Sequence, residues 1–135
     1  MNIEVRYFSK SGNTKKVADV IAEEVGVIAV PITKEISKHT DILFLGGSVY
    51  FGGIDSKLKK FILNLDNSVK KVAVFSTAAI TKSAYGEIKK LLESKNIFVF
   101  DSEFNCRGKF LKLHKERPNA DDLNLARQFA REIVK

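Results

Sequence analysis

A run of small polar residues follows the first apolar segment, and most of its side chains can donate hydrogen bonds. Apolar residues at helical spacing come directly after the run. Where a helix starts, its first backbone N–H groups lack partners within the helix and lie at the positive end of its dipole. A glycine in the run lets a ligand approach the backbone closely. The run therefore predicts an anion site, and a phosphate monoester fits it. Its residues are Ser9, Lys10, Ser11, Gly12, Asn13 and Thr14.

A simpler interpretation is that these side chains only cap the helix and turn the chain. Two common phosphate-binding patterns are absent from this run. It lacks the spaced glycines and the Lys-Ser/Thr ending of a Walker-type loop, and it lacks the Gly-x-Gly-x-x-Gly pattern of dinucleotide-binding folds. A phosphate bound here would therefore contact mostly neutral donors and a helix end.

Five short segments rich in Val, Ile and Phe predict β-strands, because turn residues flank each of them. They are residues 3–8, 27–32, 42–46, 72–75 and 97–100. Segments of helical spacing lie between them, and strands that alternate with helices form a parallel sheet with helices on both faces. We therefore predict an α/β fold, a three-layer doubly wound sheet of five parallel strands, in a single domain over residues 1–135.

The expected helices each have one apolar face, with residues at i, i+3, i+4 and i+7. The last helix also has a start signal, because Asn119 is followed three residues later by Asp122. The residues of the four faces are Val17, Val20, Ile21 and Val25; Leu58, Phe61, Ile62 and Leu65; Ile88, Leu91 and Leu92; and Leu123, Ala126, Phe129, Ala130 and Ile133.

Two features depart from a regular sandwich. Residues 33–40 are all that separates the second predicted strand from the third, which leaves room for about two helical turns at most. Glu4 and Arg6 alternate with apolar residues in the first strand, whereas an inner parallel strand is usually apolar on both faces. Either one face of that strand is less covered, or the two charges find partners.

Ligands of open parallel sheets bind beyond the carboxyl ends of the strands, where the strand order reverses. The segments to consider are therefore residues 9–14, 47–53, 76–83 and 101–118. The last segment is longer than a simple connection needs to be, and such loops are usually functional. It is also basic, with Arg107, Lys109, Lys112, Lys115 and Arg117.

The first of these segments resembles the phosphate loop of the flavodoxin family. That loop has the pattern Ser/Thr-x-Ser/Thr-Gly-x-Thr, and residues 9–14 match it at all six positions. Length and element order resemble short flavodoxin-like proteins over nearly the whole chain. The resemblance implies the strand order 2-1-3-4-5 and flavin mononucleotide (FMN) as cofactor, placed as flavodoxins place it, where the strand order reverses.

The second segment, GGSVYFGG, resembles the flavin-contacting loop of the family, often Gly-Ser/Thr-Pro-x-Tyr-x-Gly. Gly47 stands where Ser or Thr is common, and a serine replaces the usual proline, which predicts a less rigid loop. The aromatic residues can contact an apolar ring system. The alternative is that they pack on their own helix. The resemblance implies cofactor contacts at Ser48, Val49, Tyr50, Phe51 and Gly52.

The third and fourth segments are also expected to border the flavin. Small residues in the third segment would let backbone groups reach the pyrimidine edge. This segment has no aromatic residue of the kind that often covers the outer face of the flavin in electron-transfer flavodoxins, so that face is expected to be open. The expected cofactor contacts are Thr77, Ala78 and Ala79, followed by Asn105, Cys106, Arg107 and Gly108.

Cysteine, histidine and the apolar runs limit other classes of function. The single cysteine, Cys106, cannot form an intrachain disulfide, and we expect a small buried residue rather than a redox thiol. His39 and His114 lack the spacing of a ligand set, so no metal site is predicted. Neither a membrane span nor a signal peptide is evident, so a cytoplasmic location is expected.

With FMN bound, the flavin would carry the electrons, and no side chain need act as a nucleophile or a base. The first hypothesis is an electron-transfer flavoprotein that serves redox protein partners or a small electron acceptor. The alternatives are a small FMN-dependent reductase of quinones or similar acceptors, and a flavodoxin-fold binding module without flavin. A signalling receiver domain is excluded, because it needs acidic residues after the first strand and an aspartate after the third.

The formal net charge of +7 distinguishes this chain from familiar flavodoxins, which are acidic. It predicts attraction to polyanions or acidic proteins and hence atypical partners. Nucleic acid is not expected, since no basic helix face or stacking platform accompanies the charge. Lys10, Arg107 and Lys109 would favour the reduced flavin anion, which predicts a less negative last reduction step. The electron donor, the acceptor and the oligomeric state stay open.

Overall fold

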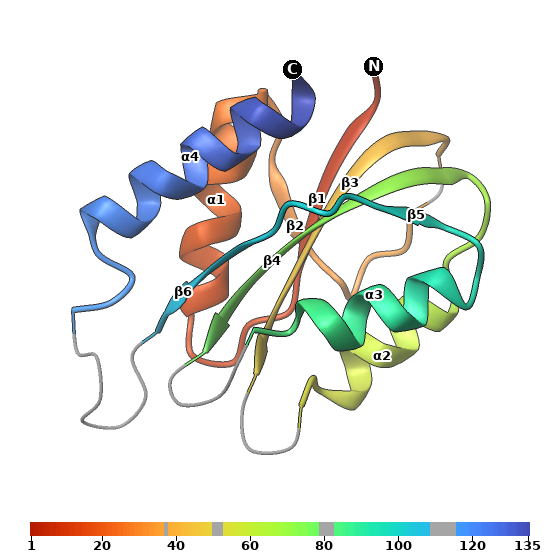
Figure 1. The fold of residues 1–135 in the computed structure, drawn as a ribbon, viewed down its shortest axis with the longest axis horizontal. Helices are drawn as coiled ribbons and strands as arrows, with labels where there is room; N and C mark the ends of the chain where they lie inside the picture. Colours follow the sequence, from red (N-terminus) through yellow and green to blue (C-terminus); the bar gives the residue numbers. More distant parts are fainter. Residues whose placement is uncertain (37, 50–52, 79–82, 109–115) are drawn as a thin grey trace.

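A parallel sheet lies between two layers of helices in the computed structural model, which describes residues 1–36, 38–49, 53–78, 83–108 and 116–135 (Figure 1). The strands of the described residues are β1 (Ile3–Tyr7), β2 (Ala29–Pro31), β3 (Thr40–Val49), β4 (Val69–Ala78), β5 (Phe98–Val99) and β6 (Phe104–Arg107). The helices of the described residues are α1 (Asn13–Val25), α2 (Ser56–Leu63), α3 (Tyr85–Glu93) and α4 (Ala120–Val134).

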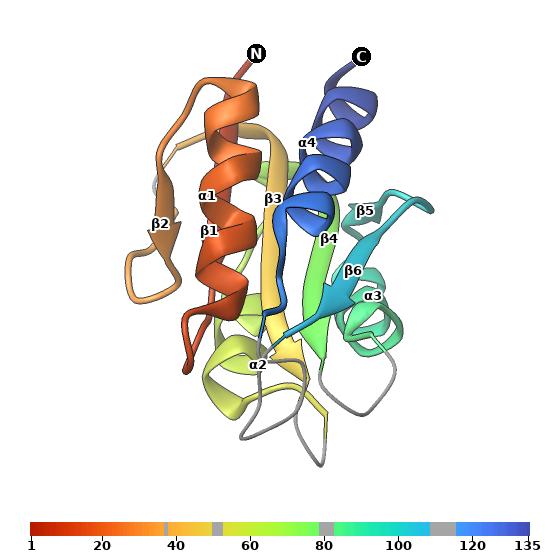
Figure 2. The same ribbon diagram turned by 90° about the vertical axis from the view of Figure 1, so that its left-hand side faces the viewer.

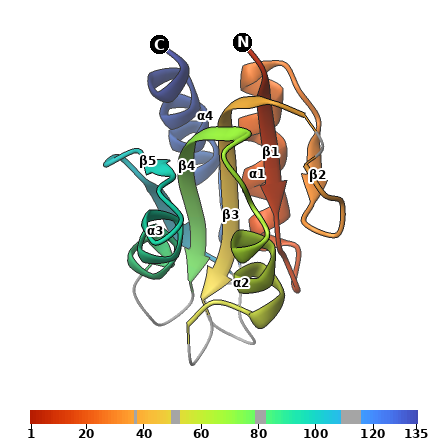
Figure 3. The same cartoon turned by 90° about the vertical axis from the view of Figure 1, so that its right-hand side faces the viewer.

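The strand order is β2-β1-β3-β4-β5, with all pairs parallel, which confirms the doubly wound α/β fold and its order. Helices α1 and α4 cover one face of the sheet (Figure 2), and α2 and α3 cover the other (Figure 3). Both termini lie at the edge opposite the carboxyl ends of β1, β3 and β4 (Figure 1). The three predicted layers are therefore present.

The last position of the sheet is shared by two short strands. β5 pairs with β4 at Lys71 and Val72, and β6 pairs with β4 from Phe75 onward. Residues 100–103 lie between β5 and β6, opposite two residues of β4, so the extra length interrupts the ladder. The prediction that the whole of 101–118 is a connection was wrong at 104–107. The apolar pattern does not predict the return of the chain to the sheet, because the exposed polar residues Asp101 and Ser102 interrupt it.

The two central strands extend beyond their apolar runs. β3 continues through Ser48 and Val49, and β4 continues through Thr77 and Ala78. The two ends lie in one ladder, in which Ser48 pairs with Thr77. Their assignment to loops was therefore wrong, because polar residues at a strand end do not show in an apolar pattern while backbone pairing still includes them.

Each face of the sheet has its own core, as the apolar periodicity predicted. Val5, Phe44 and Phe75 face α1 and α4, where Ile21 packs fully buried. The other core contains Leu43, Leu45, Val72 and Val74 from the sheet, with Leu58 and Ile62 of α2 and Ile88 and Leu92 of α3, all of them fully buried. Packing of these two cores fixes the helices that start at the carboxyl edge of the sheet.

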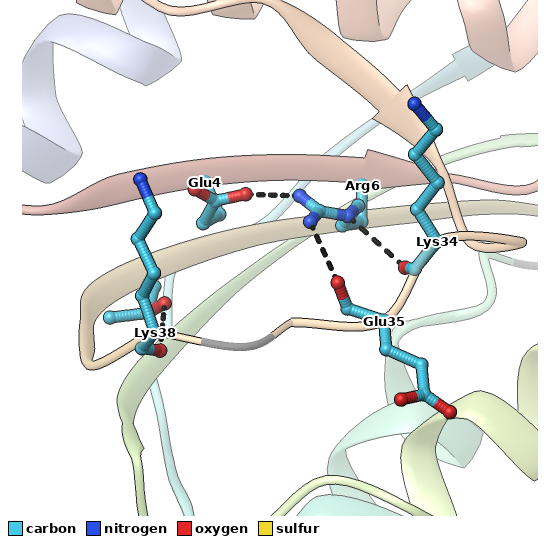
Figure 4. Close-up of polar contacts among 6 residues, drawn as sticks. Glu4, Arg6, Lys34, Glu35 and Lys38 are labelled. Atoms are coloured by element: carbon cyan, nitrogen blue, oxygen red, sulfur yellow. Dashed lines mark hydrogen bonds and ion pairs between the residues drawn. The ribbon is translucent and has the colours of Figure 1, made fainter.

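The two charges in β1 find partners, which resolves the alternative that the sequence left open (Figure 4). Arg6 is 6% exposed and forms an ion pair with Glu4. Its Nη2 atom donates to the backbone oxygen of Glu35 at 3.3 Å, and its Nε atom lies 3.5 Å from the backbone oxygen of Lys34. Burial of this guanidinium is tolerated because charge and hydrogen bonds compensate it.

The connection from β2 to β3 contains no helix among its described residues, 32–36 and 38–39. A regular crossover would cover the β1 face on the α2 side with a helix. Here an irregular segment lies over that face, and it exposes backbone carbonyls that need donors. Arg6 supplies those donors. The short crossover therefore accounts for the arginine in β1, because its backbone carbonyls need a donor at this position.

Helix α4 starts with the predicted cap. The side chain of Asn119 accepts from the N–H of Asp122 at 3.0 Å, and Asp122 accepts from the N–H of Asn119 at 2.9 Å. The Arg117 guanidinium donates two hydrogen bonds to the Asp122 carboxylate, from Nε to Oδ2 and from Nη2 to Oδ1, the latter at 2.7 Å. Burial raises the pKa of Asp122, but Arg117 and the Asn119 N–H lower it by more, so the net pKa is lowered.

We predict that Asp122→Ala lowers the free energy of unfolding by about 1–3 kcal/mol, because it removes a cap and leaves Arg117 unpaired. Asp121→Ala is the control, since Asp121 lies exposed in the same first turn, and it should cost about 0.5 kcal/mol or less. The native pKa of Asp122 is lowered, so its stabilisation is complete above about pH 4 and is lost as pH falls through that native pKa. Urea unfolding at neutral and acid pH measures both effects, and equal losses in the two variants would contradict the prediction.

Candidate functional site

The segments expected to bind a ligand meet at one edge of the sheet. Neighbouring strands end there in register, since Val49 pairs with Ala78 and Ala78 pairs with Arg107. The amino end of α1 lies at the same edge (Figure 2). The topology therefore brings residues 9–14 close to the ends of β3, β4 and β6, as expected for a parallel sheet.

Three buried hydroxyl groups join α1 to the two central strands; we refer to Thr14, Ser48 and Thr77 as the hydroxyl cluster. Thr14 Oγ1 lies 2.7 Å from Ser48 Oγ and 2.8 Å from Thr77 Oγ1. Ser48 Oγ and Thr77 Oγ1 lie 3.4 Å apart. Their exposed fractions are 0%, 5% and 2%, so each hydroxyl depends on the others for hydrogen bonds.

The loop before α1 is shaped by its own polar residues. Gly12 has a φ of +90°, a left-handed conformation that favours glycine, and its N–H donates to Ser9 Oγ at 3.0 Å. A Cβ atom on Gly12 would meet nothing within 4 Å, so the space beside this backbone is open. Ser11 is exposed. The loop thus has an exposed serine side chain and open space beside the Gly12 backbone.

The amino end of α1 differs from those of the other described helices. Among the described residues no side chain caps it, and no acidic residue lies in its first turn, which contains Lys15. By contrast, the α2 cap Asp55 accepts from the Lys57 N–H at 2.8 Å, α3 has Glu87 in its first turn, and α4 has its capping box. The positive end of the α1 dipole therefore lacks the anionic or capping side chain that the others have.

Lys10 reaches across to α2. Its Nζ atom lies 3.2 Å from Asp55 Oδ2. The pKa of Asp55 is lowered, first by the hydrogen bond from the Lys57 N–H and then by Lys10. Sequence reasoning missed Asp55, although an aspartate directly before the helical pattern of 56–63 is an N-cap signal. Its pairing with Lys10 depends on the tertiary fold and leaves no signal in the sequence.

The end of β6 packs closely on the start of α1. A Cβ atom on Gly108 would lie 2.7 Å from Asn13 Nδ2 and 3.1 Å from Asn13 Cβ. Asn13 is 8% exposed, so its side chain is held against this backbone rather than directed into solvent. The close approach requires glycine at position 108 and joins the first and fourth segments.

The other expected contacts divide into exposed and buried residues. Asn105 and Arg107 are exposed on β6. Val49 and Ala78 are buried in the core on the α2 and α3 side, so their side chains pack there. Ser76, which was not among the expected contacts, accepts from the Ala84 N–H at 3.3 Å. The expected contacts Tyr50, Phe51, Gly52 and Ala79, and the nearby Lys109, lie outside the described residues.

Cys106 faces the core between the sheet and helices α1 and α4. Burial raises the pKa of its thiol to about 12, and Asp122 contributes. The thiol is therefore protonated at neutral pH, as expected for a small buried residue. Only its backbone can border a ligand at this edge.

We predict that Thr14→Val lowers the free energy of unfolding by about 1–3 kcal/mol, because it removes the central hydroxyl and leaves two buried partners poorly paired. Thr14→Ser keeps that hydroxyl and loses one methyl group, so it should cost about 1 kcal/mol. Chemical unfolding compares the two variants. A loss in Thr14→Ser as large as in Thr14→Val would show that the hydroxyl cluster contributes little.

None of the helices in the described residues is both long enough and apolar enough to cross a membrane.

Comparison with known proteins agrees with this geometry. A family model described as a flavodoxin domain matches residues 5–109. The protein MJ0298 of Methanocaldococcus jannaschii, named as uncharacterized, is 31% identical over an alignment of 137 positions, gaps included, that covers 91% of each chain. The flavodoxin-like domain-containing protein BilS of Clostridioides difficile is 34% identical over an alignment of 118 positions, gaps included, that covers 78% of this chain and 65% of BilS.

Solved structures share the fold over the full length. A flavodoxin from the domain Archaea superposes with a TM-score of 0.84 at 21% identity, covering 99% of this chain and 96% of the other. Oxidised flavodoxin 2 from Bacillus cereus superposes with a TM-score of 0.75 at 20% identity, covering 99% and 98%. The family model spans most of the sequence and the fold agrees throughout, so the chain belongs to the flavodoxin family.

Proposed function

We propose that this protein binds FMN at the carboxyl edge of its sheet and transfers electrons between redox partners. The main support for the proposal is that the amino end of α1 has neither a side-chain cap nor an acidic residue in its first turn among the described residues. A phosphate would compensate this helix end. Membership of the flavodoxin family supports a flavin as the group that carries the phosphate.

The residues at this edge fit a phosphate monoester. Ser9 and Ser11 supply hydroxyl groups, and the open space beside Gly12 lets an oxygen atom approach the backbone. The hydroxyl cluster holds the first turn of α1 against β3 and β4. The donors would thus be in place before the ligand binds, which reduces the entropic cost of binding.

FMN, when bound, supplies the redox chemistry, and the protein supplies position and charge. Cys106 stays protonated and faces the core, so it offers no thiolate at this edge. Arg107 lies exposed at the end of β6 in register with Ala78 of β4. Arg107 is therefore placed to tune the potential of a bound flavin, whereas the Cys106 thiol takes no part in the chemistry. Sustained turnover of a nicotinamide cofactor and a quinone by the purified protein would instead identify a reductase.

The proposal predicts that FMN binds at least about 100-fold more tightly than riboflavin, because hydrogen bonds to a charged phosphate contribute about 1.5–3 kcal/mol each. Ser11→Ala should weaken FMN binding and leave riboflavin binding unchanged. Ser102→Ala, at an exposed serine between β5 and β6, is the control and should change neither. Quenching of flavin fluorescence measures the affinity of the unchanged protein and of both variants for each of the two flavins.

A protein that is colourless on purification and takes up no added FMN would contradict the proposed function. Equal affinities for FMN and riboflavin would contradict the placement of the phosphate at α1 while leaving flavin binding intact. The two failures are therefore distinguishable.

Positive charge at the cofactor edge should make the last reduction potential less negative than in acidic flavodoxins. Arg107→Gln is expected to shift this potential to more negative values. Lys135→Gln removes the same charge at the end of α4, at the opposite edge of the molecule (Figure 1), and should leave the potential unchanged. Redox titration of the flavin absorbance at low and high salt gives the comparison. A potential as low as in acidic flavodoxins, unaffected by salt or by Arg107→Gln, would refute this role of the charge.

A further inference from the structure

We propose that Glu87 of α3 is a positioning residue for the part of the candidate site that would border the flavin ring. Its side chain binds the backbone of the connection from β3 to α2 and holds that connection at the end nearest α2. The inference rests on the proposed FMN binding and deepens it, because Glu87 is not among the residues expected to contact the cofactor.

The contact joins two segments that are 33 residues apart in the sequence. Glu87 Oε1 accepts from the Ile54 N–H at 3.0 Å. A Cβ atom on Gly53 would lie 2.5 Å from the same oxygen, so the carboxylate occupies the space beside this backbone that a side chain would take. Gly53 has a φ of +103°, a left-handed conformation that favours glycine. The carboxylate therefore packs directly against the backbone of the connection.

The start of α3 is itself fixed to the sheet. Ser76, fully buried in β4, accepts from the Ala84 N–H at 3.3 Å. The Tyr85 hydroxyl donates to the backbone oxygen of Phe100 at 2.8 Å. Both contacts lie within three residues of Glu87 along α3. A side chain on a helix end held in this way can restrain the more irregular segment that it binds.

The same segment is also held from the side of α1. Asp55 follows Ile54 directly, caps α2, and lies 3.2 Å from the Nζ atom of Lys10 in the loop before α1. Glu87 supplies the contact from α3, which lies beside α2 on this face of the sheet (Figure 3). Two consecutive residues of the connection are thus bound to different elements, so the tertiary fold determines where the connection ends.

This placement matters because the connection starts at the candidate cofactor edge. Val49, the last residue of β3, pairs with Ala78 at one end of the connection, and Glu87 binds Ile54 at the other. The expected flavin contacts at residues 50–52 stand between these two points in the sequence. A connection with both ends held loses less conformational entropy when a ligand binds. Loss of the Glu87 contact should therefore weaken binding of the flavin ring.

Positioning and charge predict opposite effects for the removal of Glu87. Its carboxylate is negative, so charge alone predicts that removal tightens the binding of the anionic FMN. Positioning predicts weaker binding of both FMN and riboflavin, which has no phosphate. Riboflavin is neutral, so its affinity separates the two effects. The expected pattern also differs from that of Ser11→Ala, which should weaken FMN binding alone.

The test measures flavin affinity and amide hydrogen exchange in the full-length protein. Glu87 is exposed, so its variants remove no core packing. Glu87→Ala should weaken FMN and riboflavin binding by a similar factor, about 3- to 10-fold. It should also speed exchange of the Ile54 amide hydrogen in the flavin-free protein, because that hydrogen loses its acceptor.

Two matched variants separate positioning from charge. Glu87→Gln removes the charge and keeps a side-chain oxygen that can accept from Ile54, so it should change riboflavin affinity by less than about twofold. Glu93→Ala removes the same charge at an exposed position at the other end of α3, and it should change neither the affinities nor the Ile54 exchange.

The outcomes that contradict the proposal are distinct. Unchanged flavin affinities in Glu87→Ala would overturn the positioning role and leave FMN binding intact. Equal losses in Glu87→Ala and Glu87→Gln would assign the effect to charge in the first turn of α3 and overturn the proposal. Weaker FMN binding with unchanged riboflavin binding would assign it to the phosphate, with the same consequence. If the unchanged protein binds neither flavin, the proposed function fails together with this role of Glu87.

Discussion

The contact between Thr14 and the hydroxyl groups of Ser48 and Thr77 is the constraint on which the candidate site depends. Three buried hydroxyls satisfy one another only if α1, β3 and β4 keep their positions within a few tenths of an ångström. The parallel register places Ser48 beside Thr77, and the position of α1 lets Thr14 reach both. This polar contact fixes the loop before α1, because the loop joins β1 to the first turn of that helix.

The parts of the fold governed by local periodicity could be predicted from the sequence. Ile21, Leu58 and Phe129 are buried where helical spacing places them, and the α4 cap follows from Asn119 and Asp122. The ends of β3 and β4 could not, because backbone pairing with a distant strand decides whether a polar residue continues a ladder. For the same reason, the contact that fixes the site was not predicted, although each of its hydroxyl residues was named.

The charged side chains show a second limit of prediction from the sequence, because the partners of several of them lie far away along the chain. The sequence could not decide how β1 accommodates Arg6, because the carbonyls that accept from it belong to a connection 28 and 29 residues away. The sequence also could not show that, around the phosphate loop, Lys10 pairs with Asp55 and Lys15 pairs with Asp19 at 2.8 Å. Local ion pairs offset part of the positive charge there, and more of the excess lies between residues 33 and 95.

The amino end of α1 combines these features. An acidic cap would stabilise this helix end by about 1 kcal/mol, yet the helix is held instead from the inner side by neutral hydroxyls that bind one another. This arrangement fixes the helix without placing a carboxylate where an anionic ligand would bind. The structure therefore separates two tasks that one cap usually performs, since the buried cluster positions the helix and the outer surface stays suited to a phosphate.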